Sequence, residues 1–371
     1  MSASASCSTR HPATVERPQG PLFDTDHRKI EAHGAGMLLD TTTARVYWYG
    51  ESAKSADFTT HAIHVYSSHN LARWRFEGVA LRSTDIIGLS GETSPGWILE
   101  RPKVLFNVLT GLYVLWAHLE GPAMRPAIVP TMPVWSNYMS GAAAVAVSRT
   151  PAGPFRFVHA LRPSGGLRTF DASLFFDERT RKAYRVQDVN HASVGYFELD
   201  DSYTNYTGRV VGVLNEPREG VAPFFWKGRY YLATSGLAGW APSSSKLYVR
   251  DDLHSGAWES SNPFPKGPAR GTSFFSQSAH VLVYEAEHID SATAGAGAGG
   301  ASGGGQQALW IADRWCAPRH RCKLDWCPCL LNASYLWMPL VHAQRDGDTA
   351  KVNVQWCGHE WRPPPPSWKG K

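Results

Sequence analysis

Short stretches rich in aromatic and β-branched residues recur along the chain, about 45 to 80 residues apart. Residues of these types favour pleated, buried strands, and the apolar positions do not follow a long helical period. The recurring stretches are VYWYG (46–50), LYVLWAH (112–118), KAYRVQD (182–188), RYYLATS (229–235) and ALWIADR (308–314). Five copies predict five similar units of β-structure.

Most of these stretches are followed by a second strand and a hairpin-like unit, in which a strand leads through a polar turn to another aromatic residue. The clearest copies span residues 63–78, 144–158 and 246–259, and residues 351–361 could supply a last strand. The spacing is typical of multi-stranded propeller blades with inserted loops. The sequence therefore predicts an all-β fold, a five-bladed β-propeller with a central funnel. A pair of β-sandwiches is the structural alternative.

Three segments fall outside this repeat. Residues 1–22 are polar and contain proline, which predicts a disordered N-terminal tail. The low-complexity run SATAGAGAGGASGGG cannot pack into a core and predicts a loop insertion over residues 291–306. The proline-rich residues 363–371 predict a C-terminal tail. Residues 23–362 remain as one propeller domain, which would carry the catalytic site.

Composition narrows the classes of partner. Aromatic residues make up 12% of the chain and include 15 tryptophans, which can fill a β core or stack on the apolar faces of sugars. The net charge is +5, without a dense run of Lys and Arg, so we expect no binding to nucleic acid. No stretch approaches the roughly 20 apolar residues that span a bilayer, so we expect no membrane association.

The cysteines leave several interpretations open. Four of the six lie between residues 316 and 329, in a C-x5-C-x4-C-x-C pattern that lacks the paired C-x2-C of ordinary zinc sites. Zinc, disulfides and free thiols are all compatible with this cluster. Sequons at Asn205 and Asn332 favour a secretory route, as disulfides would, whereas the N-terminus has no apolar region of a signal peptide. The sequence leaves the compartment open, with secretion favoured.

Three carboxylates lie at corresponding places, the start of the innermost predicted strand of successive blades: Glu100, Asp171 and Glu219. In a propeller these places converge on the funnel. Glycoside hydrolysis needs an acid for the leaving oxygen, and apolar neighbours keep a carboxyl group protonated by raising its pKa. The alternative is that each acid pairs with an arginine close to it in sequence: Arg101, Arg168 and Arg218. At the matching places, the fifth blade has Gln277 and the first has His33.

A set of motifs runs in order from about residue 30 to residue 361: IEAHGAGML, VYWYGE, VYSSHNLARWRFEG, ERPKVLFN, GLYVLWAH, GVAPFFWKGRYYLATSG, GWAPSSSKLYV, FFSQS, IADRW and YLWMPL. Together they resemble glycoside hydrolase family 43, and specifically its exo-β-1,3-galactanase branch. Most of family 43 uses an Asp in the first blade as general base. This chain has AHGAG there, and the galactanase branch is similar in lacking that Asp.

The resemblance implies a role for each matching residue. Glu219 would be the general acid, Asp171 would orient it and tune its pKa, and Gln277 would hold the attacking water. Sugar contacts would come from Glu100, Glu51, Tyr138, His33 and Trp240. The implied activity is that of an inverting exo-enzyme, a monomer without cofactor or metal, that acts on the β-1,3-galactan of arabinogalactan-type glycans.

The chain departs from the branch at two places that supply sugar contacts in relatives. Asn190-His191-Ala192 replaces a Glu-Asn-Asn-like run, and Leu237-Ala238 replaces Cys-Thr. A propeller that binds glycans without cleaving them is therefore one alternative. Another family 43 activity, on arabinofuranose or xylose, is a second, and a protein-interaction scaffold is a third.

Overall fold

The fold is seen in a computed structural model, which describes residues 21–52, 62–94, 96–121, 138, 140–264, 269–286, 305–315, 333–342, 352–354 and 366–368. All six cysteines and Asn332, the asparagine of one sequon, lie outside the described residues. Most of the predicted N-terminal tail and most of the predicted insertion at 291–306 also lie outside them.

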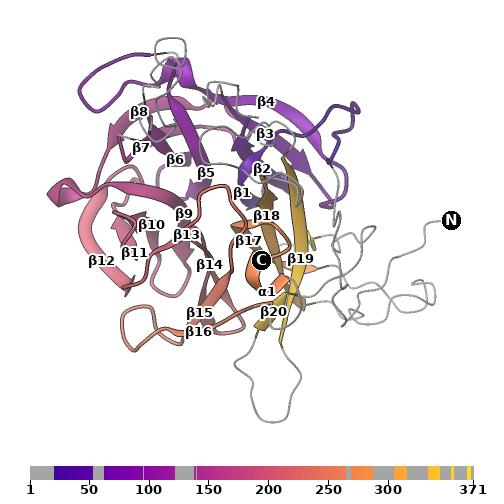
Figure 1. The fold of residues 1–371 in the computed structure, drawn as a ribbon. Helices are drawn as coiled ribbons and strands as arrows, with labels where there is room; N and C mark the ends of the chain where they lie inside the picture. Colours follow the sequence, from indigo (N-terminus) through magenta and orange to yellow (C-terminus); the bar gives the residue numbers. More distant parts are fainter. Residues whose placement is uncertain are drawn as a thin grey trace.

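Five antiparallel sheets of four strands each surround a common centre as the blades of a β-propeller (Figure 1). Blade one contains β1 (His33–Asp40), β2 (Arg45–Glu51), β3 (Ala62–Ser68) and β4 (Arg75–Arg82). Blade two contains β5 (Ile98–Asn107), β6 (Leu112–Glu120), β7 (Ala142–Ser148) and β8 (Arg156–Leu161). Blade three contains β9 (Thr169–Asp177), β10 (Lys182–Val189), β11 (Ser193–Leu199) and β12 (Tyr206–Leu214). Blade four contains β13 (Arg218–Trp226), β14 (Arg229–Gly236), β15 (Lys246–Arg250) and β16 (Glu259–Ser261). Blade five contains β17 (Gln277–Ala286), β18 (Gly305–Arg314), β19 (Ser334–His342) and β20 (Val352–Val354).

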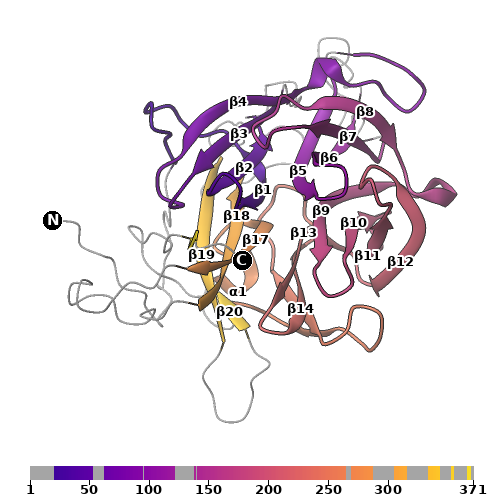
Figure 2. The same ribbon diagram turned by 180° about the vertical axis from the view of Figure 1, so that it is seen from behind.

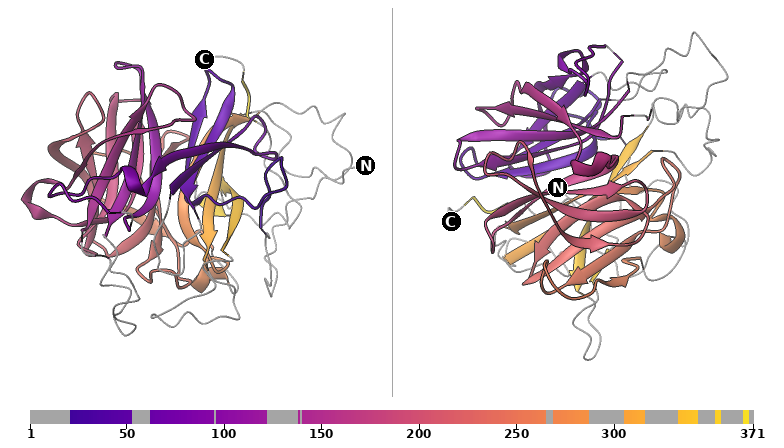
Figure 3. Two further views of the ribbon diagram at one scale, coloured as in Figure 1. Left: turned by 90° about the horizontal axis from the view of Figure 1, so that it is seen from above. Right: turned by 90° about the vertical axis from the view of Figure 1, so that its left-hand side faces the viewer.

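The predicted five-bladed propeller is confirmed, and the β-sandwich alternative is not. Each recurring aromatic stretch forms the second strand of a blade, and β1, β5, β9, β13 and β17 are the innermost strands. Short helical turns occur at η1 (Ser83–Asp85), η3 (Ser164–Gly166) and α1 (Ala269–Thr272). Figure 3 views the ring from two further sides, with the blades visible as twisted sheets.

The strands are apolar on both faces because each blade is packed between two others. In β7, alternate residues point to opposite faces of the sheet. Ala142, Ala144 and Ala146 pack toward blade one, whereas Ala143 and Val145 pack toward blade three. The small alanine side chains let neighbouring blades approach closely. This double burial explains why the strands lack the apolar–polar alternation of a sheet with one wet face.

Blades five and one lie side by side where the ring closes (Figure 2). Their side chains pack together, and the two described sheets share no strand. The indole of Trp48 in β2 lies edge-on to Trp337 of β19, with ring centroids 5.1 Å apart. Residues 366–368, part of the predicted C-terminal tail, lie against this contact. The Ser367 N–H donates to the Glu285 carbonyl (2.6 Å) and the Trp368 indole donates to the His69 carbonyl of blade one (3.0 Å). The described part of that segment is therefore docked on the propeller.

Candidate active site

The innermost strands share a local irregularity that turns polar side chains toward the centre of the ring. The register of β5 shifts between Glu100 and Lys103, and that of β13 shifts between Glu219 and Ala222. Comparable shifts occur in the first strand pair of the other three blades. Bulges of this kind bend a strand and redirect its side chains. At the β13 bulge, Gly220 has φ +60° and a Cβ there would lie 2.7 Å from the Ser278 carbonyl, so this turn needs glycine.

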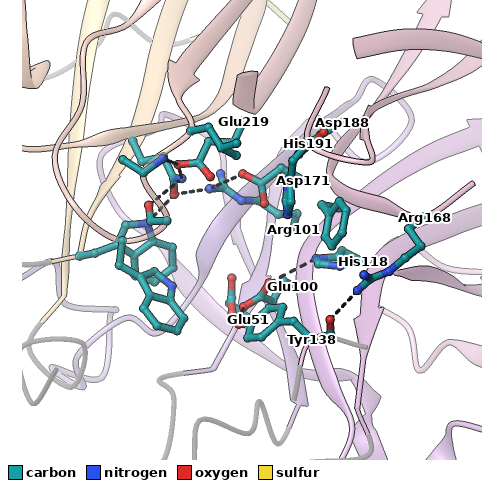
Figure 4. A pocket seen from close by; sticks show the side chains of 17 residues that line it. Glu51, Glu100, Arg101, His118, Tyr138, Arg168, Asp171, Asp188, His191 and Glu219 are labelled. Carbon is teal, nitrogen blue, oxygen red and sulfur yellow. Dashed lines mark hydrogen bonds and ion pairs between the residues drawn. The ribbon is translucent and has the colours of Figure 1, made fainter. Parts of the chain in front are cut away.

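These side chains line one cavity of about 590 Å³, a size typical of sites for small ligands (Figure 4). The cavity receives residues from all five blades. Seven of the eight predicted site residues line it: Glu51, Glu100, Tyr138, Asp171, Glu219, Trp240 and Gln277. The structure thus brings together the positions that were expected to converge on the funnel.

His33 is the eighth predicted residue, and it is not among the described residues that line the cavity. Its ring is buried and stacked on Tyr335, with centroids 4.7 Å apart. Nδ1 lies 3.3 Å from the Asp313 carboxylate, and the ring lies 5.2 Å from that of Trp315, which does line the cavity. From this position His33 can support the cavity wall behind Trp315, whereas the predicted contact with a sugar would need it to line the cavity.

Glu219 is a buried carboxyl group at the start of β13. Its Oε1 accepts hydrogen bonds from the Ala238 N–H (3.0 Å) and from the Gln277 amide (2.9 Å). Burial raises the pKa of Glu219 to about 8, and the negative charge of Asp171 adds to this, against the opposing effect of the two hydrogen bonds and of Arg101. A carboxyl group with this pKa is protonated at neutral pH and can give its proton to a substrate.

Asp171 is held beside Glu219 by two contacts. Its Oδ2 accepts the backbone N–H of Gly220 (2.7 Å), the residue after Glu219, and forms an ion pair with Arg101 (3.1 Å). Arg101 comes from blade two and has φ +52°, so the guanidinium joins blades two, three and five. The predicted role of Asp171, to orient the acid and tune its pKa, is compatible with this position.

The arginines next to the three acids in sequence have other partners. Arg101 pairs with Asp171 of the next blade. The Arg218 guanidinium donates to Thr234 Oγ1 (2.9 Å) and to the Ser244 carbonyl (3.0 Å). Arg168 donates to the Tyr138 carbonyl (2.5 Å). These contacts do not support the alternative of three local acid–arginine pairs.

Gln277 starts β17 and lies between the acid and the arginine. Its Oε1 accepts from the Arg101 guanidinium and from the Trp315 indole (2.7 Å). Its Nε2 donates to Glu219 Oε1 (2.9 Å) and to the Gly239 carbonyl (3.1 Å). An amide side chain has two acceptor and two donor positions, and all four are used. A water could bind the Gln277 amide in the predicted way only if one of these bonds broke.

Glu100 belongs to a buried chain of charges that the sequence did not predict. Its Oε1 accepts the Tyr138 hydroxyl (2.7 Å), and its Oε2 lies 3.3 Å from His118 Nδ1. His118 Nε2 lies 3.0 Å from Glu120, which also accepts the backbone N–H of Gly141 (2.9 Å). Burial alone would lower the pKa of His118, but the bonds to both carboxylates outweigh it and raise the pKa to about 9. His118 is therefore a cation that holds Glu100 in place.

Residues from both segments that differ from the family pattern line the cavity. His191 lies at the tip of the β10–β11 hairpin, where the Ala192 N–H donates to the Val189 carbonyl (3.0 Å). The His191 ring stacks on Phe170, with centroids 3.7 Å apart, and Nδ1 bonds to Asp188 (2.6 Å). Leu237 and Ala238 line the cavity near Glu219. The sequence marked the 190–192 segment as a sugar-contacting place, but Asp188 was not predicted, because only the fold brings the end of a second strand to the funnel.

The described residues offer neither a metal site nor a membrane-spanning helix. They contain no group of three or more His, Cys, Asp or Glu side chains placed to hold a metal ion. No helix in the described part of the chain is long and apolar enough to cross a membrane.

Comparisons with known proteins find similar folds among the solved structures. No family model and no curated protein matches the sequence. Among solved structures, the chain is similar to a variant of an exo-β-1,3-galactanase from Phanerochaete chrysosporium bound to β-1,3-galactotriose (26% identity, TM-score 0.69), over 91% of this chain and 66% of that one. It is similar to an exo-β-1,3-galactanase from Clostridium thermocellum (25%, TM-score 0.71), over 93% of this chain and 67% of that one.

A further similar structure is a GH43 β-1,3-galactosidase with galactodeoxynojirimycin (26%, TM-score 0.70), over 92% of this chain and 98% of that one. The chain spans about two thirds of the length of the two galactanases. It has the fold of the glycoside hydrolase family 43 propellers. The similarity supports a glycoside hydrolase with a carbohydrate substrate.

Proposed function

We propose that this protein is an inverting, exo-acting glycosidase that releases galactose from β-1,3-galactan. The observation that carries the proposal is the Glu219 carboxyl group, which is buried, has a raised pKa and lies in a cavity that can hold a sugar. The substrate class rests on the names of the similar structures, which are β-1,3-galactanases and a β-1,3-galactosidase.

In the proposed reaction, Glu219 gives its proton to the glycosidic oxygen as the bond to the anomeric carbon breaks. Water adds to that carbon from the opposite face and releases its proton to solvent, and the Glu219 carboxylate takes up a proton from solvent before the next turnover. The Asp171 charge favours the protonated acid before the reaction. Glu100 and Glu51 accept hydrogen bonds from sugar hydroxyls, and Tyr138 and Trp240 supply aromatic surface for a sugar face.

A propeller that binds glycans without cleaving them is the second candidate function. The observation that favours it is the position of the residues that differ from the galactanase pattern. His191, Leu237 and Ala238 all line the cavity. Glu219, Asp171 and Gln277 favour hydrolysis instead, because a binding protein has no need of a buried carboxyl group kept protonated at neutral pH.

Galactose release from β-1,3-galactan tests the proposal. We expect galactose as the main product and, by NMR at early times, the α-anomer first, because inversion converts a β-linkage into an α-product. The β-anomer first would contradict inversion. If the folded protein releases nothing from galactan, arabinan or xylan but still binds one of them, the binding function replaces the enzymatic one.

Asp171→Asn is expected to move the high-pH limb of activity to lower pH. Glu219 works only while protonated, so kcat/KM should fall as pH rises through about 8. The negative charge of Asp171 raises the pKa of Glu219. Removing this charge lowers that pKa, so activity is lost at a lower pH. The measurement is kcat/KM against pH, with exposed Asp251→Asn as the matched control. An unmoved limb in the Asp171 variant would argue against this coupling.

A further inference from the structure

We infer that Gln277 is a positioning residue, which acts on the reaction by fixing the proton of Glu219 on Oε2. The inference rests on the proposed function, in which Glu219 is the acid. The observation that carries it is that all four hydrogen-bonding positions of the Gln277 amide are used by protein partners, which lie on two other blades and on its own.

The orientation of the Gln277 amide is set by the chemistry of its partners. Arginine and tryptophan side chains are donors only, so the amide oxygen must face Arg101 and Trp315. The Gly239 carbonyl is an acceptor only, so the amide nitrogen must face it. A flipped amide would set donor against donor on one side and acceptor against acceptor on the other. The N–H that points to Glu219 is therefore fixed.

This N–H decides where the proton of Glu219 resides. Oε1 of Glu219 accepts two hydrogen bonds, one from the Gln277 amide and one from the Ala238 N–H. A proton on Oε1 would collide with these donors, so the neutral acid carries its proton on Oε2. Among the described residues, none donates a hydrogen bond to Oε2. Oε2 is thus the oxygen left to meet the glycosidic oxygen of a substrate.

If Gln277 instead held the attacking water, its amide would need different properties. This role needs at least one free position on the amide, and it would be improved by a stronger base. A carboxylate accepts a proton far more readily than an amide does. The two roles therefore predict opposite effects of replacing Gln277 with glutamate.

The test is Gln277→Glu, assayed on β-1,3-galactan across pH. We expect kcat to fall roughly 10- to 100-fold, because the new carboxyl group draws the proton of Glu219 into the space between the two groups and away from Oε2. The high-pH limb should move up, since a second acid beside Glu219 disfavours its ionisation. A kcat equal to or above that of the wild type would overturn the inference and favour the water-holding role.

A second variant, Gln277→Met, tests the inference without an activity assay. Its result can therefore be told apart from misfolding and from failure of the proposed function. Methionine has a similar length and cannot donate to Glu219, so the pKa of Glu219 should rise. The readout is a ¹³C NMR titration of the Glu219 carboxyl group, identified by the signal that Glu219→Gln removes, with a thermal unfolding curve to show that the variant is folded. An unchanged titration overturns the inference. Absence of galactose release by the wild type would reject the proposed function alone, because the titration needs no substrate.

Discussion

Replacing Glu219 with glutamine is expected to lower the proposed galactose release from β-1,3-galactan by roughly 10²–10⁴-fold, the range typical for loss of a general acid. Glutamine has nearly the same shape and keeps an oxygen for the bonds from Ala238 and Gln277, but its amide does not protonate a leaving oxygen. The loss should be mainly in kcat, because substrate binding does not need the proton. Initial rates with wild type and variant at pH 6 to 7 measure it.

Two comparisons sharpen this result. Glu259→Gln makes the same chemical change on β16, the outer strand of the same blade, at an exposed position, and should leave the rate unchanged. An aryl β-galactoside with a good leaving group needs little help from an acid, so Glu219→Gln should slow it much less than it slows galactan. Equal losses on both substrates would mean that Glu219 acts in some way other than proton donation.

His118→Gln should remove a large pH-dependent part of the folding stability. The pKa of His118 is about 9 in the folded protein, above its ordinary value of about 6.5. As pH rises, the unfolded chain thus releases the His118 proton at a lower pH than the folded protein does. This stabilisation, roughly 3 kcal/mol, is fully present below pH 6.5 and is lost as pH rises through 9. The variant leaves two buried carboxylates, Glu100 and Glu120, without the cation between them.

Urea unfolding at pH 6 and at pH 9.5 measures the effect. The wild type should lose stability between these values, and His118→Gln should be less stable than the wild type at pH 6 and close to it at pH 9.5. His159→Gln is the matched control, because His159 contacts the Thr204 carbonyl and should retain the wild-type pH dependence. Parallel curves for the wild type and His118→Gln would show that His118 carries no bound proton between the two carboxylates.

The blades could be predicted because each contains a second strand whose residues are buried by blades on both sides. That burial leaves a run such as VYWYG at 46–50, which stands out against the polar loops. The start of the next inner strand then marks where a polar side chain reaches the funnel. Glu100, Asp171, Glu219 and Gln277 follow this rule, and Tyr138, placed by resemblance, lines the same cavity with its hydroxyl 2.7 Å from Glu100.

The partners of these residues could not be predicted, because they depend on how bulges aim side chains between blades. Arg101 is next to Glu100 in sequence, but its backbone turns with φ +52° and its guanidinium reaches Asp171 of the following blade. His33 occupies the matching place in blade one, and its ring instead lies against Tyr335 of blade five. A single strand pattern contains no information on such contacts across blades.

A ribosome makes this protein one blade at a time, because every sheet is a continuous stretch of chain. Glu219 is synthesised before Gln277 and Trp315, so a nascent chain that ends after blade four has the acid without the partners that set its proton. Such a chain would also expose the apolar faces of blades one and four that blade five covers. Truncated or stalled products should therefore be inactive and should be bound by chaperones that recognise apolar surface.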